Sequence, residues 1–181
     1  MKGRLVLVVG PSGAGKDSVL RSAAHQLQGD DRYVFVRRVI TRQADANVED
    51  HDTITETQFL QAVKLNQFIL HWGAHGNFYG IPVAVENDLQ RGRIVCINVS
   101  RAVLSEAASR FTDLLVVEIT APFETRVARI IARGREAQDA VMKRALRDVP
   151  QYPDELNIKT INNDGNLEDA VIQFAQLLRG L

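Results

Sequence analysis

The sequence has little cysteine, no excess of charge of either sign and no long apolar run, and each absence excludes a class of protein. Its single cysteine, Cys96, cannot form a disulfide within the chain. Lysine plus arginine equal aspartate plus glutamate at 22 each, so the global charge favours neither nucleic acid nor an anionic membrane as a partner. No apolar run reaches the roughly 18 residues of a membrane span, and the short run before Gly10 is too short for a signal peptide. We therefore expect a cytoplasmic protein that binds neither nucleic acid nor membrane.

What the sequence does contain is a regular alternation of two patterns. With 181 residues, 45% of them apolar, the chain is long enough for the core of one domain. Short runs rich in valine, isoleucine and leucine predict strands at residues 5–9, 34–40, 94–99, 114–119 and 157–161. Amphipathic segments predict helices at residues 16–27, 55–64, 82–90, 101–111, 123–133, 138–149 and 167–178. The alternation predicts an α/β fold with a mostly parallel sheet covered by helices on both faces.

Two segments depart from this alternation. Residues 68–80, FILHWGAHGNFYG, predict short antiparallel strands, and residues 126–147 predict a helical segment with seven lysines and arginines against two acidic residues. We interpret them as additions to one domain that spans residues 1–181. The first belongs to an acceptor-binding region at about 33–92, and the second is a lid at about 126–147.

The stretch GPSGAGKDS, which follows the first predicted strand and opens the first predicted helix, has the pattern of a phosphate-binding loop. Its glycines allow successive backbone N–H groups to converge on phosphate oxygens, and Lys16 reaches the outer phosphates. The pattern therefore predicts the fold of the P-loop nucleoside triphosphatases, with Lys16 as a catalytic cation. The predicted triphosphate-binding residues in this stretch are Gly10, Pro11, Ser12, Gly13, Ala14, Gly15, Lys16, Asp17 and Ser18.

Asp17 stands where such loops ordinarily carry the hydroxyl that helps to hold Mg²⁺. A hard cation also accepts carboxylate oxygen, so Asp17 is a candidate metal ligand. Alternatively, Asp17 complements the positive end of the helix dipole while Ser18 or water serves the metal. The sequence favours these two interpretations equally.

Four candidate residues for an anionic acceptor follow. Arg38 and Arg42 belong to an arginine cluster at the end of the second predicted strand, and the guanidinium fork suits phosphate. Tyr79 offers a hydroxyl beside glycines that permit close approach, and His71 could meet an anion. The alternative interpretations are a solvated face for the arginines and hairpin packing or a structural role for the other two.

Two arginines of the lid, Arg133 and Arg144, are candidate catalytic residues. Phosphoryl transfer depends on positioning and on cations that stabilise charge on the moving group. A phosphate acceptor is already ionised near neutral pH, so the reaction needs no catalytic base. The absence of an obvious base from the sequence is consistent with such an acceptor.

Over nearly its whole length the chain resembles the guanylate kinase family. The resemblance is carried by GPSGAGKDS, by ITRQADANVEDHD, by GNFYG, by the segment from ARGRE to KRAL and by INND. It implies ATP as the phosphoryl donor, Arg42 and Tyr79 as ligands of the acceptor phosphate, and Arg133 and Arg144 as stabilisers of the transferring group. It also implies that Asn162 and Asn163 lie near adenine.

The departures from that family are concentrated where the base of GMP would be read. Asp45 replaces a second arginine, His71 replaces a glutamate, and Asn98 and Ser100 replace acidic residues. Loss of carboxylates that accept from guanine should weaken base recognition by several kcal/mol, on the order of one to three for each unpaired group. The combination is similar to the ribose 1,5-bisphosphate phosphokinases of bacterial phosphonate catabolism. This implies Mg²⁺- and ATP-dependent phosphorylation of a small sugar bisphosphate to 5-phosphoribosyl 1-diphosphate; the alternatives are a nucleoside monophosphate kinase and a non-catalytic binding module.

Overall fold

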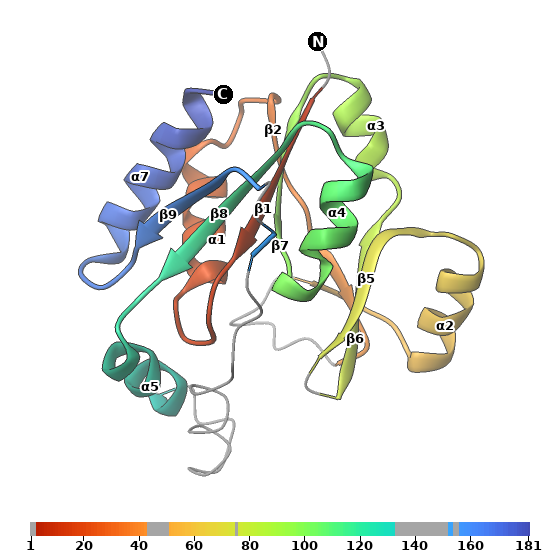
Figure 1. The fold of residues 1–181 in the computed structure, drawn as a ribbon, viewed down its shortest axis with the longest axis horizontal. Coiled ribbons are helices and arrows are strands. Elements are labelled where there is room, and N and C mark those ends of the chain that lie inside the picture. Colours follow the sequence, from red (N-terminus) through yellow and green to blue (C-terminus); the bar gives the residue numbers. More distant parts are fainter. Residues whose placement is uncertain (1–2, 43–50, 75, 133–151, 154–155) are drawn as a thin grey trace.

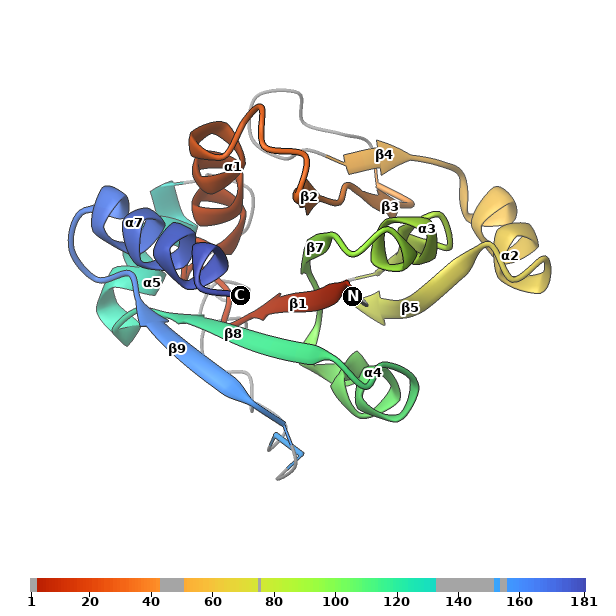
Figure 2. The ribbon, with the colours of Figure 1, turned by 90° about the horizontal axis from the view of Figure 1, so that it is seen from above.

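The centre of the protein is a parallel sheet, seen edge-on in Figure 2. The structure is a computed structural model, and it describes residues 3–42, 51–74, 76–132, 152–153 and 156–181. The strand order is β2-β7-β1-β8-β9, and every neighbouring pair is parallel. The strands are β1 (Arg4–Val9), β2 (Tyr33–Phe35), β7 (Ile94–Asn98), β8 (Leu114–Thr120) and β9 (Ile158–Asn162).

Helices cover both faces of this sheet. Successive residues of a strand point to opposite faces, and in the central strands both sets are apolar, so both faces must be buried. In β1, Val6 and Val8 face a core shared with α1 (Lys16–Gln26) and α7 (Leu167–Arg179). Leu5, Leu7 and Val9 face the other core, towards α3 (Val85–Gln90), the short η1 (Arg101–Val103) and α4 (Leu104–Arg110). Figures 1 and 2 show α1 and α7 side by side on one face and α4 on the other.

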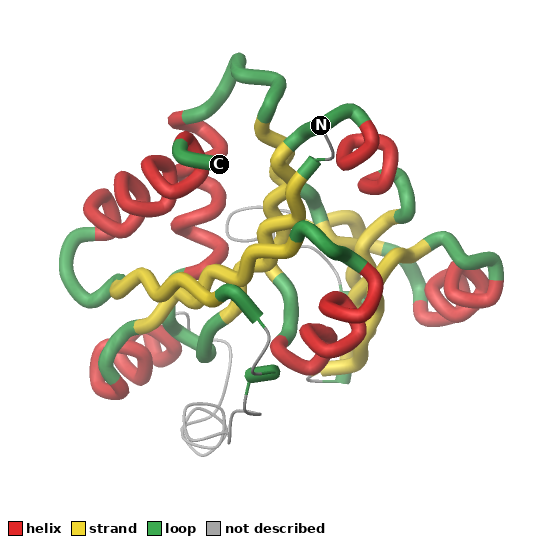
Figure 3. The backbone as a smooth tube through the Cα atoms, turned by 45° about the horizontal axis from the view of Figure 1, so that its top comes forward, coloured by secondary structure: helices red, strands yellow, loops and turns green. Residues whose placement is uncertain are grey.

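A second sheet is built from the segment between α1 and α3. Its strand order is β4-β3-β6-β5, with β3 and β4 parallel and the other pairs antiparallel. The strands are β3 (Arg38–Ile40), β4 (His51–Thr53), β5 (Phe68–Ala74) and β6 (Asn77–Pro82). In Figure 3 these strands lie beside the parallel sheet, and α2 (Glu56–Lys64) is at the outer end.

Local sequence explains how α2 begins and what it covers. Thr55 caps the helix: its side chain accepts a hydrogen bond from the backbone of Gln58, and the Gln58 side chain accepts one from the Thr55 backbone. The ring of Phe59 then stacks on Phe68 and Phe78, with centroids 4.8 and 5.4 Å away. The helix therefore covers one face of the second sheet and leaves the opposite face to the inner core.

The predicted α/β class and parallel sheet are confirmed, and so is the antiparallel hairpin, formed by β5 and β6. The predicted strand at 34–40 is two strands, because β2 pairs with β7 while β3 joins the second sheet. Cys96 is buried in β7, where burial raises the pKa of its thiol, as expected for a core residue. The predicted helix at 138–149 lies outside the described residues. No helix in the described part of the chain is long and apolar enough to cross a membrane.

Candidate functional site

The phosphate loop joins the carboxyl end of β1 to the amino end of α1, above α5 (Phe123–Ala132) in Figure 1. Gly10, Gly13 and Gly15 all have positive φ angles, of 142°, 82° and 90°. A Cβ atom on Gly10 would lie 2.1 Å from the carbonyl oxygen of Ile119, and one on Gly13 would lie 2.6 Å from that of Arg126. The loop therefore requires glycine both for its backbone conformation and for its packing against β8 and α5.

Lys16 lies at the mouth of this loop. Its ammonium Nζ donates to the carbonyl oxygens of Gly10 and Pro11, at 2.8 and 3.1 Å. The first turn of α1 follows directly, so the positive end of the helix dipole lies beside the same ammonium. Pro11, Ser12 and Ser18 are partly exposed around the loop. The arrangement concentrates positive potential where a triphosphate would enter.

Asn163, just after β9, stabilises the phosphate loop through a buried contact. Its side-chain Nδ2 donates to the carbonyl oxygen of Ala14 at 2.8 Å, and its own backbone oxygen accepts from Arg129 of α5 at 2.9 Å. Asn163 is 2% exposed, whereas its neighbour Asn162 is exposed. Two residues assigned together from the sequence thus occupy different environments, and Arg129, which the sequence analysis did not select, lies beside the loop.

Asp17 joins the phosphate loop to two other elements. Its Oδ1 atom accepts from the guanidinium of Arg38 on β3, at 3.1 Å, and from the amide of Asn98 at the end of β7, at 2.6 Å. The Asp17 and Arg38 side chains are 37% and 13% exposed. Arg38, a predicted acceptor-binding residue on the second sheet, is therefore paired with Asp17, the unusual residue of the phosphate loop.

Arg38 also lies over Tyr79 of β6. Its guanidinium carbon is 5.8 Å from the centroid of the Tyr79 ring, and that ring stacks on Trp72 with centroids 5.3 Å apart and an interplanar angle of 4°. Tyr79 pairs with Ile40 across β3 and β6, so all these side chains lie on the inner face of the second sheet. The structure thus brings together Arg38 and Tyr79, two of the four predicted acceptor residues.

Arg42 follows β3 and is held by its backbone. Its carbonyl oxygen is 3.1 Å from the Thr53 hydroxyl, which donates to it, and 3.3 Å from Nε2 of His51. His51 is 2% exposed, and burial lowers the pKa of its imidazole. These contacts with β4 fix the point at which the Arg42 side chain leaves the second sheet.

His71 is not brought together with the other acceptor candidates. It precedes Trp72 in β5 and pairs with Gly80, so it lies on the opposite face of the second sheet from Tyr79. Its exposed side chain is edge-on to Phe59 of α2, with centroids 6.4 Å apart. The predicted catalytic residues Arg133 and Arg144, and the substituted position Asp45, lie outside the described residues.

A polar cluster at the ends of β7 and β8 was missed by the sequence analysis. Arg101 forms an ion pair with Glu118, and its Nε donates to the hydroxyl of Tyr152 at 2.8 Å. The Arg101 and Glu118 side chains are 12% and 17% exposed, and burial raises the pKa of the Tyr152 phenol. Glu118 follows four apolar residues within β8 (Leu114–Thr120), and an acidic residue after such a run was the available signal. Its partner is an arginine, which offsets the negative charge of this carboxylate.

Within the ranges that the structure describes, no three histidine, cysteine, aspartate or glutamate residues gather into a metal cluster. Asp17 is a carboxylate of suitable chemistry at the start of α1. Mg²⁺ commonly keeps several waters and takes only one or two protein carboxylates together with phosphate oxygens. Asp17 therefore fits a Mg²⁺ that arrives with a triphosphate, although two donors already converge on one of its oxygens.

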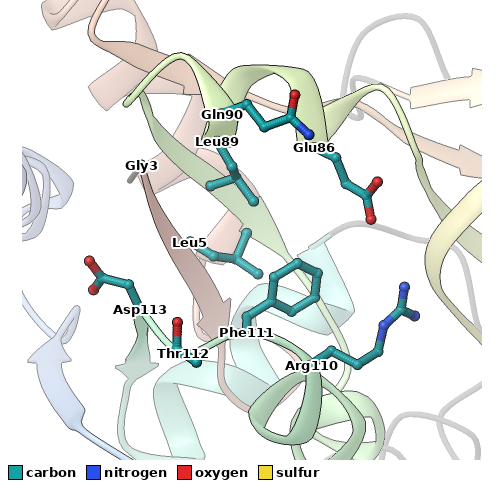
Figure 4. Close-up of a pocket in the computed structure, with 9 residues that line it drawn as sticks. All are labelled: Gly3, Leu5, Glu86, Leu89, Gln90, Arg110, Phe111, Thr112 and Asp113. Atoms are coloured by element: carbon teal, nitrogen blue, oxygen red, sulfur yellow. The ribbon is translucent and has the colours of Figure 1, made fainter. Parts of the chain in front are cut away.

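A pocket of about 250 Å³ lies at the other end of the parallel sheet, near the amino end of β1. Figure 4 shows Leu5, Leu89 and Phe111 facing its centre, with Glu86 and Arg110 nearby. Its lining is mainly apolar, and it contains none of the loop or acceptor residues described above. The glycine-rich loop, Lys16 and Arg38, whose chemistry suits phosphate, lie at the opposite end of the sheet.

Comparison with known proteins agrees with this geometry. The sequence model of the family described as guanylate kinase matches residues 2–180. A ribose 1,5-bisphosphate phosphokinase PhnN of Methylobacterium radiotolerans is 44% identical over 99% of both chains. The PhnN of Brucella melitensis is 42% identical over 92% of this chain and 86% of its own.

A bifunctional ribose 1,5-bisphosphokinase-thymidine phosphorylase of Cupriavidus pinatubonensis is 42% identical over 98% of this chain. This chain spans 29% of the length of that relative. Among solved structures, a guanylate kinase from Anaplasma phagocytophilum superposes with a TM-score of 0.71 over 99% of this chain and 86% of its own, at 18% identity, which shows the shared fold. By its sequence over nearly its full length and by its fold, the chain belongs to the guanylate kinase family.

Proposed function

We propose that the protein is an ATP-dependent kinase that phosphorylates ribose 1,5-bisphosphate to 5-phosphoribosyl 1-diphosphate. The observation that carries this proposal is the meeting of a phosphate loop with a basic, aromatic acceptor face through Asp17, Arg38 and Tyr79. The names of the relatives that are 39 to 44% identical give the identity of the sugar. A place in bacterial phosphonate catabolism follows from the same resemblance.

On the donor side, the backbone of residues 10–15 and the ammonium of Lys16 hold the β- and γ-phosphates of ATP. Asn163 and Arg129 fix the loop from behind, so its N–H groups keep their directions when charge moves between phosphates. Mg²⁺, when bound with ATP, neutralises the phosphate oxygens, and Asp17 is the side chain that would hold it directly or through water. Arg133 and Arg144 complete this proposal as cations on the transferring group.

On the acceptor side, Arg38, Arg42 and Tyr79 hold the phosphate that receives the new group. Arg38 is mostly buried between Asp17 and the Tyr79 ring, so its guanidinium is oriented before the acceptor arrives. The acceptor oxygen is an ionised phosphate oxygen, which attacks the γ-phosphorus while the ADP oxygen leaves with the bonding electrons. No proton has to be removed in this step, so none of these residues acts as a base.

The product identifies the reaction. We expect ³¹P NMR of a mixture with ATP, Mg²⁺ and ribose 1,5-bisphosphate to show loss of the anomeric monophosphate and growth of two coupled diphosphate resonances besides those of ADP. Lys16→Met should slow their appearance about 100-fold or more, because one preorganised cation is lost. Release of inorganic phosphate without a sugar diphosphate would contradict the proposal, and stabilisation by ligands without any turnover would favour a non-catalytic binding module.

A further inference from the structure

Three elements that are far apart in the sequence meet at one oxygen atom. Asp17 lies in the first turn of α1, Arg38 begins β3 of the second sheet, and Asn98 ends β7. Oδ1 of Asp17 accepts from both of the others, at 3.1 Å from Arg38 and 2.6 Å from Asn98. At this oxygen, hydrogen bonds join the end of the phosphate loop to the parallel sheet and to the second sheet.

The chemistry of this junction depends on a carboxylate at position 17. A serine or threonine hydroxyl carries no charge, so it would not form an ion pair with a guanidinium. An ionised carboxylate only accepts hydrogen bonds, so Asn98 must turn its NH₂ group towards it. An acid at position 98 would instead set two carboxylates at hydrogen-bond distance. Asp17 and Asn98, which seemed two separate departures in the sequence, are therefore parts of one arrangement.

Arg38 keeps other donors besides the one that Asp17 accepts. A guanidinium has five N–H groups in a planar fork, and one of its terminal nitrogens bonds to Asp17. Its plane is also restricted by the Tyr79 ring below it, which in turn is fixed by stacking on Trp72. The contacts with Asp17 and with the Tyr79 ring together restrict the orientation in which the guanidinium of Arg38 can bind a phosphate.

We propose that Asp17 is a positioning residue for the acceptor: it holds Arg38 in the orientation that binds the acceptor phosphate, and it keeps this contact when the acceptor is bound. The inference rests on the proposed function, and it assigns Asp17 a role on the acceptor side in addition to any role towards Mg²⁺. The ligand class is a sugar phosphate dianion. Because one end of the contact is in the donor loop, the acceptor is held in register with the γ-phosphate.

The test is a double-mutant cycle on acceptor binding, measured by calorimetry with ribose 1,5-bisphosphate and no nucleotide or metal. Asp17→Asn should weaken acceptor binding by about tenfold, because it removes the charge that orients the fork of Arg38. Arg38→Lys should weaken it by a similar factor, because an ammonium has no planar fork to orient. The double variant should be no more than about twofold weaker than either single variant, since both changes break the same interaction. Arg37→Lys is the matched control: Arg37 pairs with Asp52 and the His51 carbonyl, and its replacement should leave acceptor affinity unchanged.

Three outcomes would contradict the positioning role. Additive losses in the double variant would mean that Asp17 and Arg38 act separately. An Asp17→Asn protein with wild-type acceptor affinity but an altered Mg²⁺ requirement would assign Asp17 to the metal alone. Asp17→Glu, which retains the charge, should bind the acceptor better than Asp17→Asn, and the opposite order would also contradict the role. Thermal melting checks that each variant is folded, and failure of the wild type to bind ribose 1,5-bisphosphate at all would overturn the proposed function instead.

Discussion

At the scale of single residues, Asp17 shows what a motif does and does not predict. The phosphate-loop pattern placed it correctly at the start of a helix, and its chemistry left two interpretations, a metal ligand and a partner of the helix dipole. Its contacts with Arg38 and Asn98 span 21 and 81 residues of sequence, so no local pattern could indicate them. A carboxylate in an unusual position was the signal, and the partners came only from the tertiary structure.

The first prediction concerns Asn98→Asp. The new carboxylate would lie within hydrogen-bond distance of Asp17, and repulsion between like charges would raise the pKa of one of the two acids. A raised pKa in the folded state favours folding at low pH, so the variant should lose stability as the pH rises through that pKa. Melting temperatures measured from about pH 5 to 8 should show this loss in Asn98→Asp but not in Asn98→Ala, which loses the same amide without adding charge. Parallel pH profiles for the two variants would be evidence against the shared site.

The second prediction concerns His71→Gln. His71 lies on the α2 face of the second sheet, away from Arg38 and Tyr79, so the replacement should leave the KM for the acceptor unchanged. Tyr79→Leu is the positive control, because it removes the ring beneath Arg38 and should raise that KM about tenfold. Steady-state kinetics with the acceptor varied at saturating ATP measures both. A larger effect from His71→Gln than from Tyr79→Leu would contradict this prediction. It would mean that His71 does contact the acceptor, as its replacement of a family glutamate had suggested.

At the scale of elements, the phosphate loop depends on Asn163, which follows β9, as well as on its own glycines. Asn163→Ala removes the donor to the buried carbonyl oxygen of Ala14, which should cost about 1–3 kcal/mol in the free energy of unfolding and weaken ATP binding. Asn162→Ala, at the neighbouring exposed position, should change stability by less than about 0.5 kcal/mol. Urea unfolding and ATP titration of the two variants provide the comparison. Equal effects would mean that Asn163 does not support the loop.

The pairing of β3 with β4 gives a prediction for pH. Burial lowers the pKa of His51 below its ordinary value of 6.5, so the unfolded chain binds the proton more readily than the folded protein does. This contribution to stability is complete above that ordinary value and is lost as the pH falls from it towards the lower folded-state pKa. The fall in melting temperature from about pH 7.5 to 5 should therefore be smaller in His51→Gln than in the wild type. An unchanged slope in the variant would assign the acid sensitivity to other groups.

The elements differ in how far the sequence could predict them. The buried strands β1, β7 and β8 follow from short continuous apolar runs, which are typical of strands covered on both faces. β4 has the sequence HDT and is a strand only because it pairs with β3, so no periodicity indicated it. The split of residues 34–40 was also hidden, because β2 and β3 are both short extended segments that pair with different sheets.

At the scale of the whole molecule, function depends on how two sheets are placed against each other. The alternation of strands and helices predicted the parallel sheet, and the motif GPSGAGKDS predicted the loop at its carboxyl edge, which is where open α/β sheets place ligands. The face that the second sheet turns towards that loop depends on strand register, and a register shift of one residue exchanges the two faces. For this reason the sequence could nominate Arg38, Tyr79 and His71 together, whereas the structure places only the first two on the inner face.

The measurement that tests the central claim most directly is a comparison of kcat/KM for ribose 1,5-bisphosphate and for GMP, with ATP and Mg²⁺ in both assays. Our account predicts a preference for the sugar bisphosphate of about 100-fold or more, because the amide of Asn98 and the hydroxyl of Ser100 replace carboxylates that would accept from guanine. ADP formation, followed by a coupled assay, measures both values on one preparation, and Lys16→Met gives the background. Comparable values for the two acceptors, or a preference for GMP, would contradict the account.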